Sequence, residues 1–181
     1  MTLVRRRMDI SNEALPYLHE LRDRTQETVH LAVLKRADIM CLSNLQSQQA
    51  IGMRSYLGIR KPAVCTGEGR AILTFCKPAL LARVVQQSEQ AHQRMTSAQV
   101  KLLNKVLEEV RRQGFATDDE ESDVGMRGLA APIRNSGGDV IAAIGLAGPV
   151  QRLNKKRIRR FVPVVVGAAQ AISIRLGYRP D

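Results

Sequence analysis

The sequence predicts an α+β fold, with helices packed on an antiparallel sheet and long helices at both ends of the chain. Three observations support this prediction. Apolar residues recur at helical spacing near each end, at Leu15, Leu18 and Leu21 and again from Ile158 onwards. Short stretches between these ends alternate with period two or are apolar throughout, as strands are. Two such stretches flank Asn-Ser-Gly-Gly at 135–138, a sequence typical of a tight hairpin turn.

The N-terminal third is predicted to contain one helix followed by strands. The helix covers Leu15 to Leu21, with Pro16 near its start, where the missing N–H costs little. Thr28–Lys35 alternates with period two, and Ile39–Leu45 follows after a short polar break, which indicates two antiparallel strands. A further short strand is expected within Ile51–Leu57.

Helices are predicted in the middle of the chain. Gly67–Phe75 has a helical pattern that continues after Pro78. A stronger helix begins with Ser97 as its N-cap and ends at Gly114, which suits a left-handed C-terminal cap. The apolar face of this helix consists of Val100, Leu103, Leu107 and Val110.

The C-terminal part predicts a pair of strands and a long helix. Arg127–Ile133 and Asp139–Ala147 hardly alternate, which favours central positions in the sheet. The helix opens at Asn154 and ends at Gly177. Pro163 lies inside it and predicts a kink or a restart, because proline removes a helical hydrogen bond.

Length and composition indicate one globular domain. The chain has 181 residues, of which 44% are apolar and 25% charged, close to ordinary globular usage. No apolar run approaches the roughly 18 residues that a membrane helix needs, and the start lacks the apolar stretch of a secretory signal. We therefore expect a cytoplasmic protein without a membrane partner.

The net charge of +11 raises the alternative of a basic nucleic-acid-binding protein. Single-strand binders use aromatic side chains for base stacking, yet aromatic residues make up only 3% of this chain and are scattered along it. Nonspecific attraction to phosphate is therefore easier to support than base recognition. The alternative stays open, and it predicts binding with a steep salt dependence.

The turn Cys65–Arg70 reads Cys-Thr-Gly-Glu-Gly-Arg directly before a predicted helix. Small residues let the backbone approach a ligand closely, and free N–H groups at a helix start attract carboxylates. The turn is therefore a candidate carboxylate holder, with an ordinary loop-to-helix turn as the alternative. The side chain of Glu68 argues against the first interpretation, because a carboxylate that points inward would repel an acid.

Five carboxylates lie between Gly114 and Pro132, namely Asp118, Asp119, Glu120, Glu121 and Asp123. Asp118 directly follows the apolar-leading stretch Phe115–Thr117, so we expect it to point inward and to accept hydrogen bonds from a ligand hydroxyl. The other four are expected in a solvated loop. No histidine lies in this stretch, so neither a metal site nor a cofactor is expected.

The cysteines fit neither a disulfide framework nor a zinc motif, and we expect free thiols at Cys41, Cys65 and Cys76. A helix N-terminus would lower the thiol pKa of Cys65 and make it a nucleophile. No local base accompanies it, however, and a buried cysteine is the commoner explanation. Cys41 and Cys76 are expected as small apolar residues in a strand and a helix.

Several motifs, taken together and in order, resemble the effector-binding domain of the IclR family of bacterial transcriptional regulators, from about Arg7 to Tyr178. They are Leu15–Leu18, Pro62–Ala71 with the sequence Pro-Ala-Val-Cys-Thr-Gly-Glu-Gly-Arg-Ala, the acidic stretch Gly114–Pro132, and Gly145–Pro149. The resemblance implies a GAF-like fold that binds a small organic acid over the sheet and forms homodimers or tetramers. It also implies a sensor that has no catalytic residues.

The resemblance places seven residues at the ligand. The backbone N–H groups of Gly67 and Glu68 would meet the ligand carboxylate, and Met53 would form an apolar wall. The residues that would line the cavity are Asp118, Gly128, Gly145 and Ala147. Glycine at 128 and 145 and alanine at 147 replace polar residues of other members, so we expect a roomier, less polar pocket. The effector would then be a carboxylic acid with a larger, aromatic body.

The resemblance also divides the chain into a connector helix region, residues 1–24, and the effector-binding domain, residues 25–181. In the family a winged helix-turn-helix precedes the connector, and the sequence ahead of Ser11 has no room for one. We expect DNA contacts only through such a domain. The alternative function is a GAF-like thiol reductase, in which Cys65 is the nucleophile and Cys41 or Cys76 resolves the oxidised sulfur.

Overall fold

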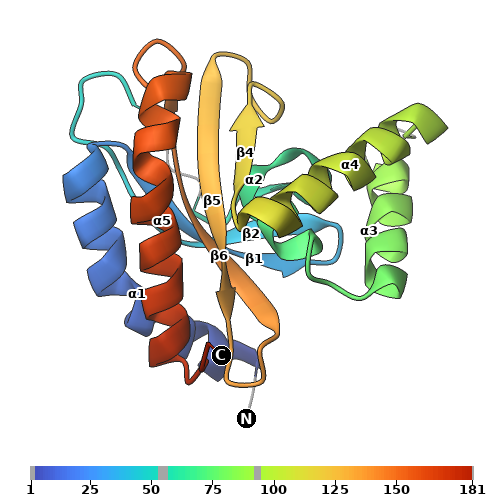
Figure 1. Cartoon of the computed structure of the whole chain (residues 1–181), viewed down its shortest axis with the longest axis horizontal. Helices are drawn as coiled ribbons and strands as arrows, with labels where there is room; N and C mark the ends of the chain where they lie inside the picture. The colour runs from blue at the N-terminus through green and yellow to red at the C-terminus, as the bar shows by residue number, and fades with distance from the viewer. Residues whose placement is uncertain (1–2, 53–56, 92–94, 181) are drawn as a thin grey trace.

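The computed structural model of the chain describes residues 3–52, 57–91 and 95–180. It confirms the α+β prediction: a sheet in the order β3-β2-β1-β6-β5-β4, with every neighbouring pair antiparallel, carries helices on both faces. Figure 1 shows α1 and α5 side by side, and α2, α3 and α4 grouped on the other side of the molecule. Among the described residues, no helix combines the length and the apolar character that crossing a bilayer requires.

The elements follow one another in a simple order. Their bounds are α1 Leu3–Thr25, β1 Thr28–Lys35, β2 Asp38–Leu45, β3 Arg60–Pro62, the 3₁₀ turn η1 Ala63–Cys65, α2 Gly67–Leu73, α3 Pro78–Ala91, α4 Ser97–Gln113, β4 Ala116–Asp119, β5 Met126–Arg134, β6 Val140–Pro149 and α5 Lys155–Arg175. The predicted strand pairs at Thr28–Leu45 and Arg127–Ala147 are confirmed as β1–β2 and β5–β6.

Strand β1 divides the interior into two apolar cores. Val29, Leu31 and Val33 point towards α1 and α5 and join the larger core. Ala32 points to the opposite face and packs into the smaller core, between the sheet and the helices α2 to α4. Successive strand residues face opposite sides, so His30 shares the face of Ala32. The period of two in the sequence thus places a histidine under α2.

Helix α1 is longer than predicted, and α5 is continuous within its predicted bounds. Helix α1 begins at Leu3, so Pro16 lies inside it rather than near its start. Helix α5 continues through Pro163 without the predicted restart. Leu18 and Leu21 of α1 are fully buried, as is Val165 of α5, and Phe161 of α5 is buried as well. Packing along the α1–α5 contact, rather than local propensity, therefore stabilises both helices across their prolines.

The strand expected within Ile51–Leu57 was wrong for the residues that the structure describes. Ile51 and Gly52 form a bend, Leu57 makes only a lone bridge to Cys41, and residues 53–56 lie outside the described residues. The edge strand is β3, which pairs with the start of β2 from Asp38 to Met40. The apolar side chain of Ile51 suggested a strand, but this residue is 72% exposed.

The N-cap of helix α4 lies one residue earlier than predicted. Thr96 is the N-cap: its side chain accepts from Gln99 N–H, and the Gln99 side chain accepts in return from Thr96 N–H. This reciprocal pair is a capping box, and it makes Ser97 the first helical residue. Gly114 has φ 83°, which confirms the predicted left-handed cap.

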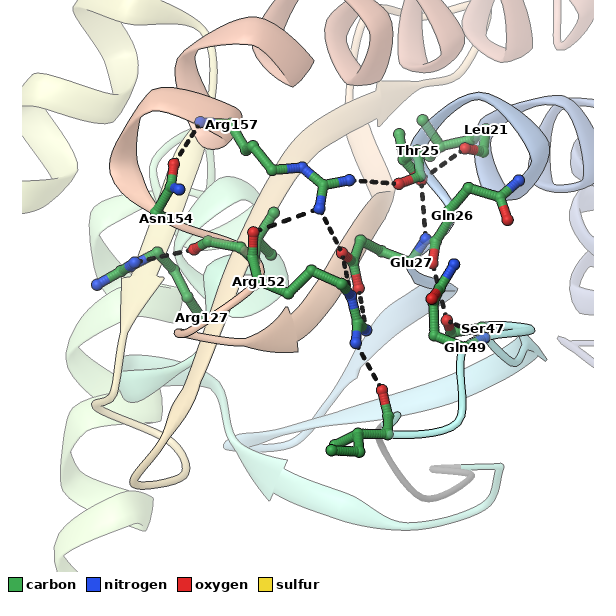
Figure 2. A network of polar contacts seen from close by, with 12 residues as sticks. Leu21, Thr25, Gln26, Glu27, Ser47, Gln49, Arg127, Arg152, Asn154 and Arg157 are labelled. Atoms are coloured by element: carbon green, nitrogen blue, oxygen red, sulfur yellow. Dashed lines mark hydrogen bonds and ion pairs between the residues drawn. The ribbon is translucent and has the colours of Figure 1, made fainter.

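The fully buried carboxylate of Glu27 connects the end of α1 to the segment around the start of α5. Glu27 follows α1, and its oxygens accept from Arg152 Nε at 2.8 Å and Nη2 at 2.6 Å. Arg157 Nη1 lies 3.6 Å from the same carboxylate, and its Nη2 donates to the backbone oxygen of Thr25. Arg152 also donates to the backbone oxygen of Ile51 (Figure 2). The network fixes α1 against the start of α5.

We expect Gly69→Ala to destabilise the domain by about 1–3 kcal/mol, the usual cost of overpacking. A Cβ there would lie closer than 3.0 Å to backbone atoms of Ala63, which cannot swing away. Gly67→Ala is the matched control, because its Cβ would make an ordinary 3.6 Å contact with Ala130. Urea unfolding measures both, and equal stability of the two variants would contradict the assignment.

Arg152→Met should cost about 3 kcal/mol, since it leaves the buried Glu27 carboxylate with only its longer contact to Arg157. The double variant Glu27→Leu/Arg152→Met should recover part of that loss, because no buried charge then lacks its partner. Arg159→Met changes an exposed arginine of the nearby helix α5 and should shift stability by less than about 0.5 kcal/mol. Chemical denaturation of the four proteins checks this.

Candidate ligand-binding site

A small cavity lies on the sheet face that carries α2. Its volume is about 40 Å³. Strands β1, β2, β5 and β6 form its floor, and β3, the start of α2 and the acidic loop that follows β4 surround it. The lining residues are His30, Ala32, Ile39, Cys41, Ile59, Lys61, Thr66, Glu68, Asp118, Ser122, Gly128 and Ala147. Residues from seven separate segments therefore meet at one point.

Four residues that the resemblance placed at a ligand line this cavity: Glu68, Asp118, Gly128 and Ala147. Gly67 does not itself line it. A Cβ on Gly67 would face Ala130, although its neighbours Thr66 and Glu68 are both in the wall. Met53 lies outside the described residues.

Gly145 does not itself line the cavity, and its role at a ligand stays a prediction. A Cβ on Gly145 would come within 2.8 Å of both Glu68 Oε1 and the backbone oxygen of Leu129. Gly145 is therefore needed for the close packing of Glu68 on β6, beneath the cavity. At Gly128, by contrast, a Cβ would keep 3.5 Å or more from its neighbours. Gly128 is thus the glycine at which a side chain would enter the cavity.

Several lining residues were not foreseen from the sequence. His30 had a usable signal, because period two in Thr28–Lys35 places it on the face of Ala32. Lys61 and Ser122 had none, since their positions depend on how β3 and the acidic loop fold over the sheet. Polar side chains also line the cavity, namely His30, Lys61, Glu68, Asp118 and Ser122, and the expectation of a pocket less polar than in other members stays a prediction.

The carboxylate of Glu68 has a specific partner in the cavity wall. His30 Nδ1 lies 3.3 Å from Glu68 Oε1, and both side chains are largely buried, at 5% and 14% exposure. Burial raises the pKa of Glu68, but the hydrogen bond and the charge of His30 outweigh it, so the pKa falls below its ordinary value. The inward carboxylate is therefore compensated by the protein itself.

Asp118 points inward, as predicted, and it organises the acidic loop. Its carboxylate accepts from the backbone N–H of Glu121 at 2.9 Å and of Ser122 at 3.2 Å, and also from the Ser122 hydroxyl. Burial raises the pKa of Asp118 above its ordinary value, although these hydrogen bonds lower it in part. The loop thus turns around a buried acid that is costly to ionise.

The remaining acids of the loop are mostly exposed to solvent, as expected, and they also have partners within the protein. Asp119 pairs with Arg127, and Glu121 with Arg70. Asp123 pairs with Lys61 of the cavity wall. Glu120 accepts from the backbone N–H of Gly125. Three basic side chains therefore hold the acidic loop down over the edge of the cavity.

The geometry does not activate Cys65. Burial raises the pKa of its thiol, the charge of Asp118 raises it further, and the sulfur donates to the backbone oxygen of Pro62 at 3.4 Å. Burial likewise raises the pKa of Cys41 to about 12. Cys76 lies in the turn after α2, not in a helix as expected. Because the thiolate is the reactive form, these environments disfavour thiol chemistry.

Metal ligands do not gather in the part of the chain that is described: no group of three or more His, Cys, Asp or Glu side chains is placed to hold an ion. The site therefore offers a small cavity, lined by both polar and apolar side chains, over a curved antiparallel sheet. This arrangement defines a small-molecule-binding domain of the GAF-like class.

The chain belongs to the IclR family of bacterial transcriptional regulators. Residues 2–174 match the family described as "Bacterial transcriptional regulator IclR C-terminal". Among curated relatives, the HTH-type transcriptional regulator KdgR of Escherichia coli K12 is 29% identical over 172 residues, covering 94% of this chain and 65% of KdgR. The HTH-type transcriptional repressor AllR of Salmonella paratyphi A is 31% identical over 173 residues, covering 95% and 64% respectively.

Solved structures of the family have the same fold as this chain. IclR of Thermotoga maritima superposes with a TM-score of 0.85 at 28% identity, covering 97% of this chain and 71% of that one. The C-terminal domain of E. coli KdgR gives a TM-score of 0.80 at 28% identity, covering 94% and 99%. This chain spans 64–65% of the length of the two curated relatives. It corresponds to the effector-binding domain, and its relatives are regulators rather than enzymes.

The two buried acids of the cavity should have opposite pH signatures. The pKa of Glu68 is lowered on folding, so Glu68→Gln should reduce stability at neutral pH. The deficit should vanish as pH falls from the ordinary value of 4.5 through the lower folded pKa. The pKa of Asp118 is raised on folding, so Asp118→Asn should be more stable than wild type at neutral pH. That advantage should fade as pH falls through the raised pKa.

Thermal unfolding of the variants and of wild type across pH 3–8, roughly the window in which carboxyls titrate, measures the two differences. Glu108→Gln, which changes an exposed acid of α4, is the control for general charge effects. A deficit for Glu68→Gln that persists unchanged at low pH would show that lost packing, not the ion pair with His30, is responsible.

Proposed function

We propose that the domain senses a small organic acid, which binds in the cavity between the sheet and the start of α2. The observation that supports this most directly is Lys61, an ammonium in the cavity wall that is held by Asp123 of the acidic loop. A ligand carboxylate can take the place of Asp123 on this lysine. The loop acid is, in this proposal, an internal substitute for the effector's own carboxylate.

The strengths of the two ion pairs favour replacement of Asp123 by a ligand carboxylate on Lys61. The side chain of Asp123 is 39% exposed, and an ion pair that open to solvent contributes only about 0–1 kcal/mol. A ligand carboxylate held deeper in the cavity would meet Lys61 with less water around it, where charge-assisted hydrogen bonds are stronger. The backbone N–H groups of Gly67 and Glu68, at the first turn of α2, are the second proposed contact.

The same cavity limits the size and the polar groups of the rest of the effector. A volume of about 40 Å³ is close to that of a single water molecule, about 30 Å³, so binding has to widen the cavity. The acidic loop and the exposed segment Leu57–Ile59 border it and are the parts placed to move. The polar groups of His30, Asp118 and Ser122 suit hydroxyl or carbonyl groups on the ligand. We therefore favour a hydroxylated or keto acid over the aromatic acid predicted from the sequence.

In a complete regulator of this family, we propose that effector binding changes the geometry between subunits and thereby the DNA-reading domains. Association into homodimers or tetramers, a cytoplasmic location and DNA contacts through a winged helix-turn-helix remain predictions. The alternative of a thiol reductase has no supporting observation, because the thiols of Cys41 and Cys65 both have raised pKa values.

Isothermal titration calorimetry tests the proposal with a panel of acids: glyoxylate, pyruvate, glycerate, gluconate and benzoate. We expect a keto or hydroxy acid to bind, and Lys61→Met to weaken it at least tenfold, or about 1.4 kcal/mol. Asp123→Asn should tighten binding severalfold, because it removes the internal competitor while keeping the size of the side chain.

Lys101→Met, on the exposed side of α4, is the charge control and should leave affinity unchanged. Cys65→Ser separates sensor from reductase: affinity should stay within about twofold, and no acid should emerge chemically altered. Benzoate binding that Lys61→Met abolishes would restore the aromatic effector for this cavity. Equal affinity of wild type and Lys61→Met for every acid would refute the proposed site.

A further inference from the structure

A second cavity, of about 310 Å³, lies away from the candidate site. It is bounded by the C-terminal half of α5, the end of β5 and the turn after α2, and it shares no lining residue with the first. Its apolar wall includes Ala131, Pro132 and Phe75, and its polar groups include Arg134 and Gln170. The volume reaches the lower end of the range of small-molecule sites, about 300 Å³.

Arg134 is the feature that gives this cavity its chemistry. Its guanidinium carbon lies 4.4 Å from the ring centroid of Phe75 and 5.9 Å from that of Tyr178, and both rings line the cavity. Nη1 donates to the backbone oxygen of Gly138 at 2.8 Å. This leaves the edge formed by Nε and Nη2, the side-on edge that binds a carboxylate with two parallel hydrogen bonds.

Other partly buried arginines show what is different here. Arg70, Arg127 and Arg152 each pair with a carboxylate of the protein. Within the part of the chain that is described, the recorded partners of the Arg134 guanidinium are one carbonyl oxygen and two ring faces. Cation–π contact alone contributes only about 0.5–1 kcal/mol at such sites. Arg134 thus has the surroundings of a charge-pairing arginine, with a cavity where the anion would be.

The backbone holds Arg134 in a defined position. Its main-chain N–H donates to the buried hydroxyl of Ser173 on α5 at 2.9 Å, so β5 is tied to α5 at the cavity wall. A second cation lies close by, because Arg111 Nη2 donates to the backbone oxygen of Thr74, next to Phe75. The local charge therefore favours an anion.

We propose that this cavity is a binding site for a small aromatic carboxylic acid. The carboxylate pairs with the Nε–Nη2 edge of Arg134, the ring packs on Ala131, Pro132 and Phe75, and the Gln170 amide serves a polar substituent. Nothing in this assignment depends on the effector site beside α2, since the two cavities have separate walls.

The test uses benzoate and records amide NMR shifts of the domain during titration, with calorimetry in parallel. We expect saturable shifts at Ala131, Gly138 and Gln170, and at least tenfold weaker binding in Arg134→Met. Gln170→Trp should also abolish binding, because a large ring at this exposed position fills the cavity without entering the core. This second variant keeps the test valid if Arg134→Met folds poorly.

Lys61→Met is the matched control from the other cavity and should leave these shifts unchanged. Benzoate shifts confined to residues around Lys61 and Gly128 would overturn the second site, and so would equal affinity in wild type and Gln170→Trp. Loss of keto- or hydroxy-acid binding in Lys61→Met with benzoate binding intact would support both sites independently.

Discussion

The buried ion cluster of Glu27 with Arg152 and Arg157 is the constraint on which the arrangement of the domain depends. A carboxylate with no exposed surface is tolerable only when its oxygens are fully paired, so both arginines have fixed positions. Gly148 has no side chain at the point where Glu27 meets β6, and a Cβ there would collide with the carboxylate. The end of α1, β1 and the start of α5 are thereby held together (Figure 2).

The same cluster also reaches towards the candidate effector site. Glu27 directly precedes β1, which supplies His30, and Gly148 directly follows Ala147 of the cavity floor. Arg152 extends the connection to the backbone of Ile51, on the path that leads to β3 and Lys61. Arg152 therefore contacts both Glu27, which directly precedes β1, and the backbone of Ile51.

The two cavities differ in size and in the partners of their basic residues. The one beside α2 is small, and the protein's own carboxylates already contact its basic groups, Glu68 on His30 and Asp123 on Lys61. The one beside α5 is larger, at about 310 Å³, and its arginine has no such internal partner in the described part of the chain. The aromatic acid that the sequence predicted for the first cavity suits the wall of the second better.

The sequence by itself determined the kinds of elements and most of their order: the period of two in β1, the hairpin turn after β5, the Gly114 cap and the inward position of Asp118 were all readable locally. The tertiary structure alone decided that α1 and α5 continue through Pro16 and Pro163, that β3 and not Ile51–Leu57 forms the edge, and that Gly128 rather than Gly145 opens into the cavity. It also gave Lys61, Ser122 and Arg134 their surroundings. Patterns of period two or 3.6 report on neighbours along the chain, whereas Glu27 and Arg152 meet across 125 positions. Such contacts follow from packing, which no local pattern encodes.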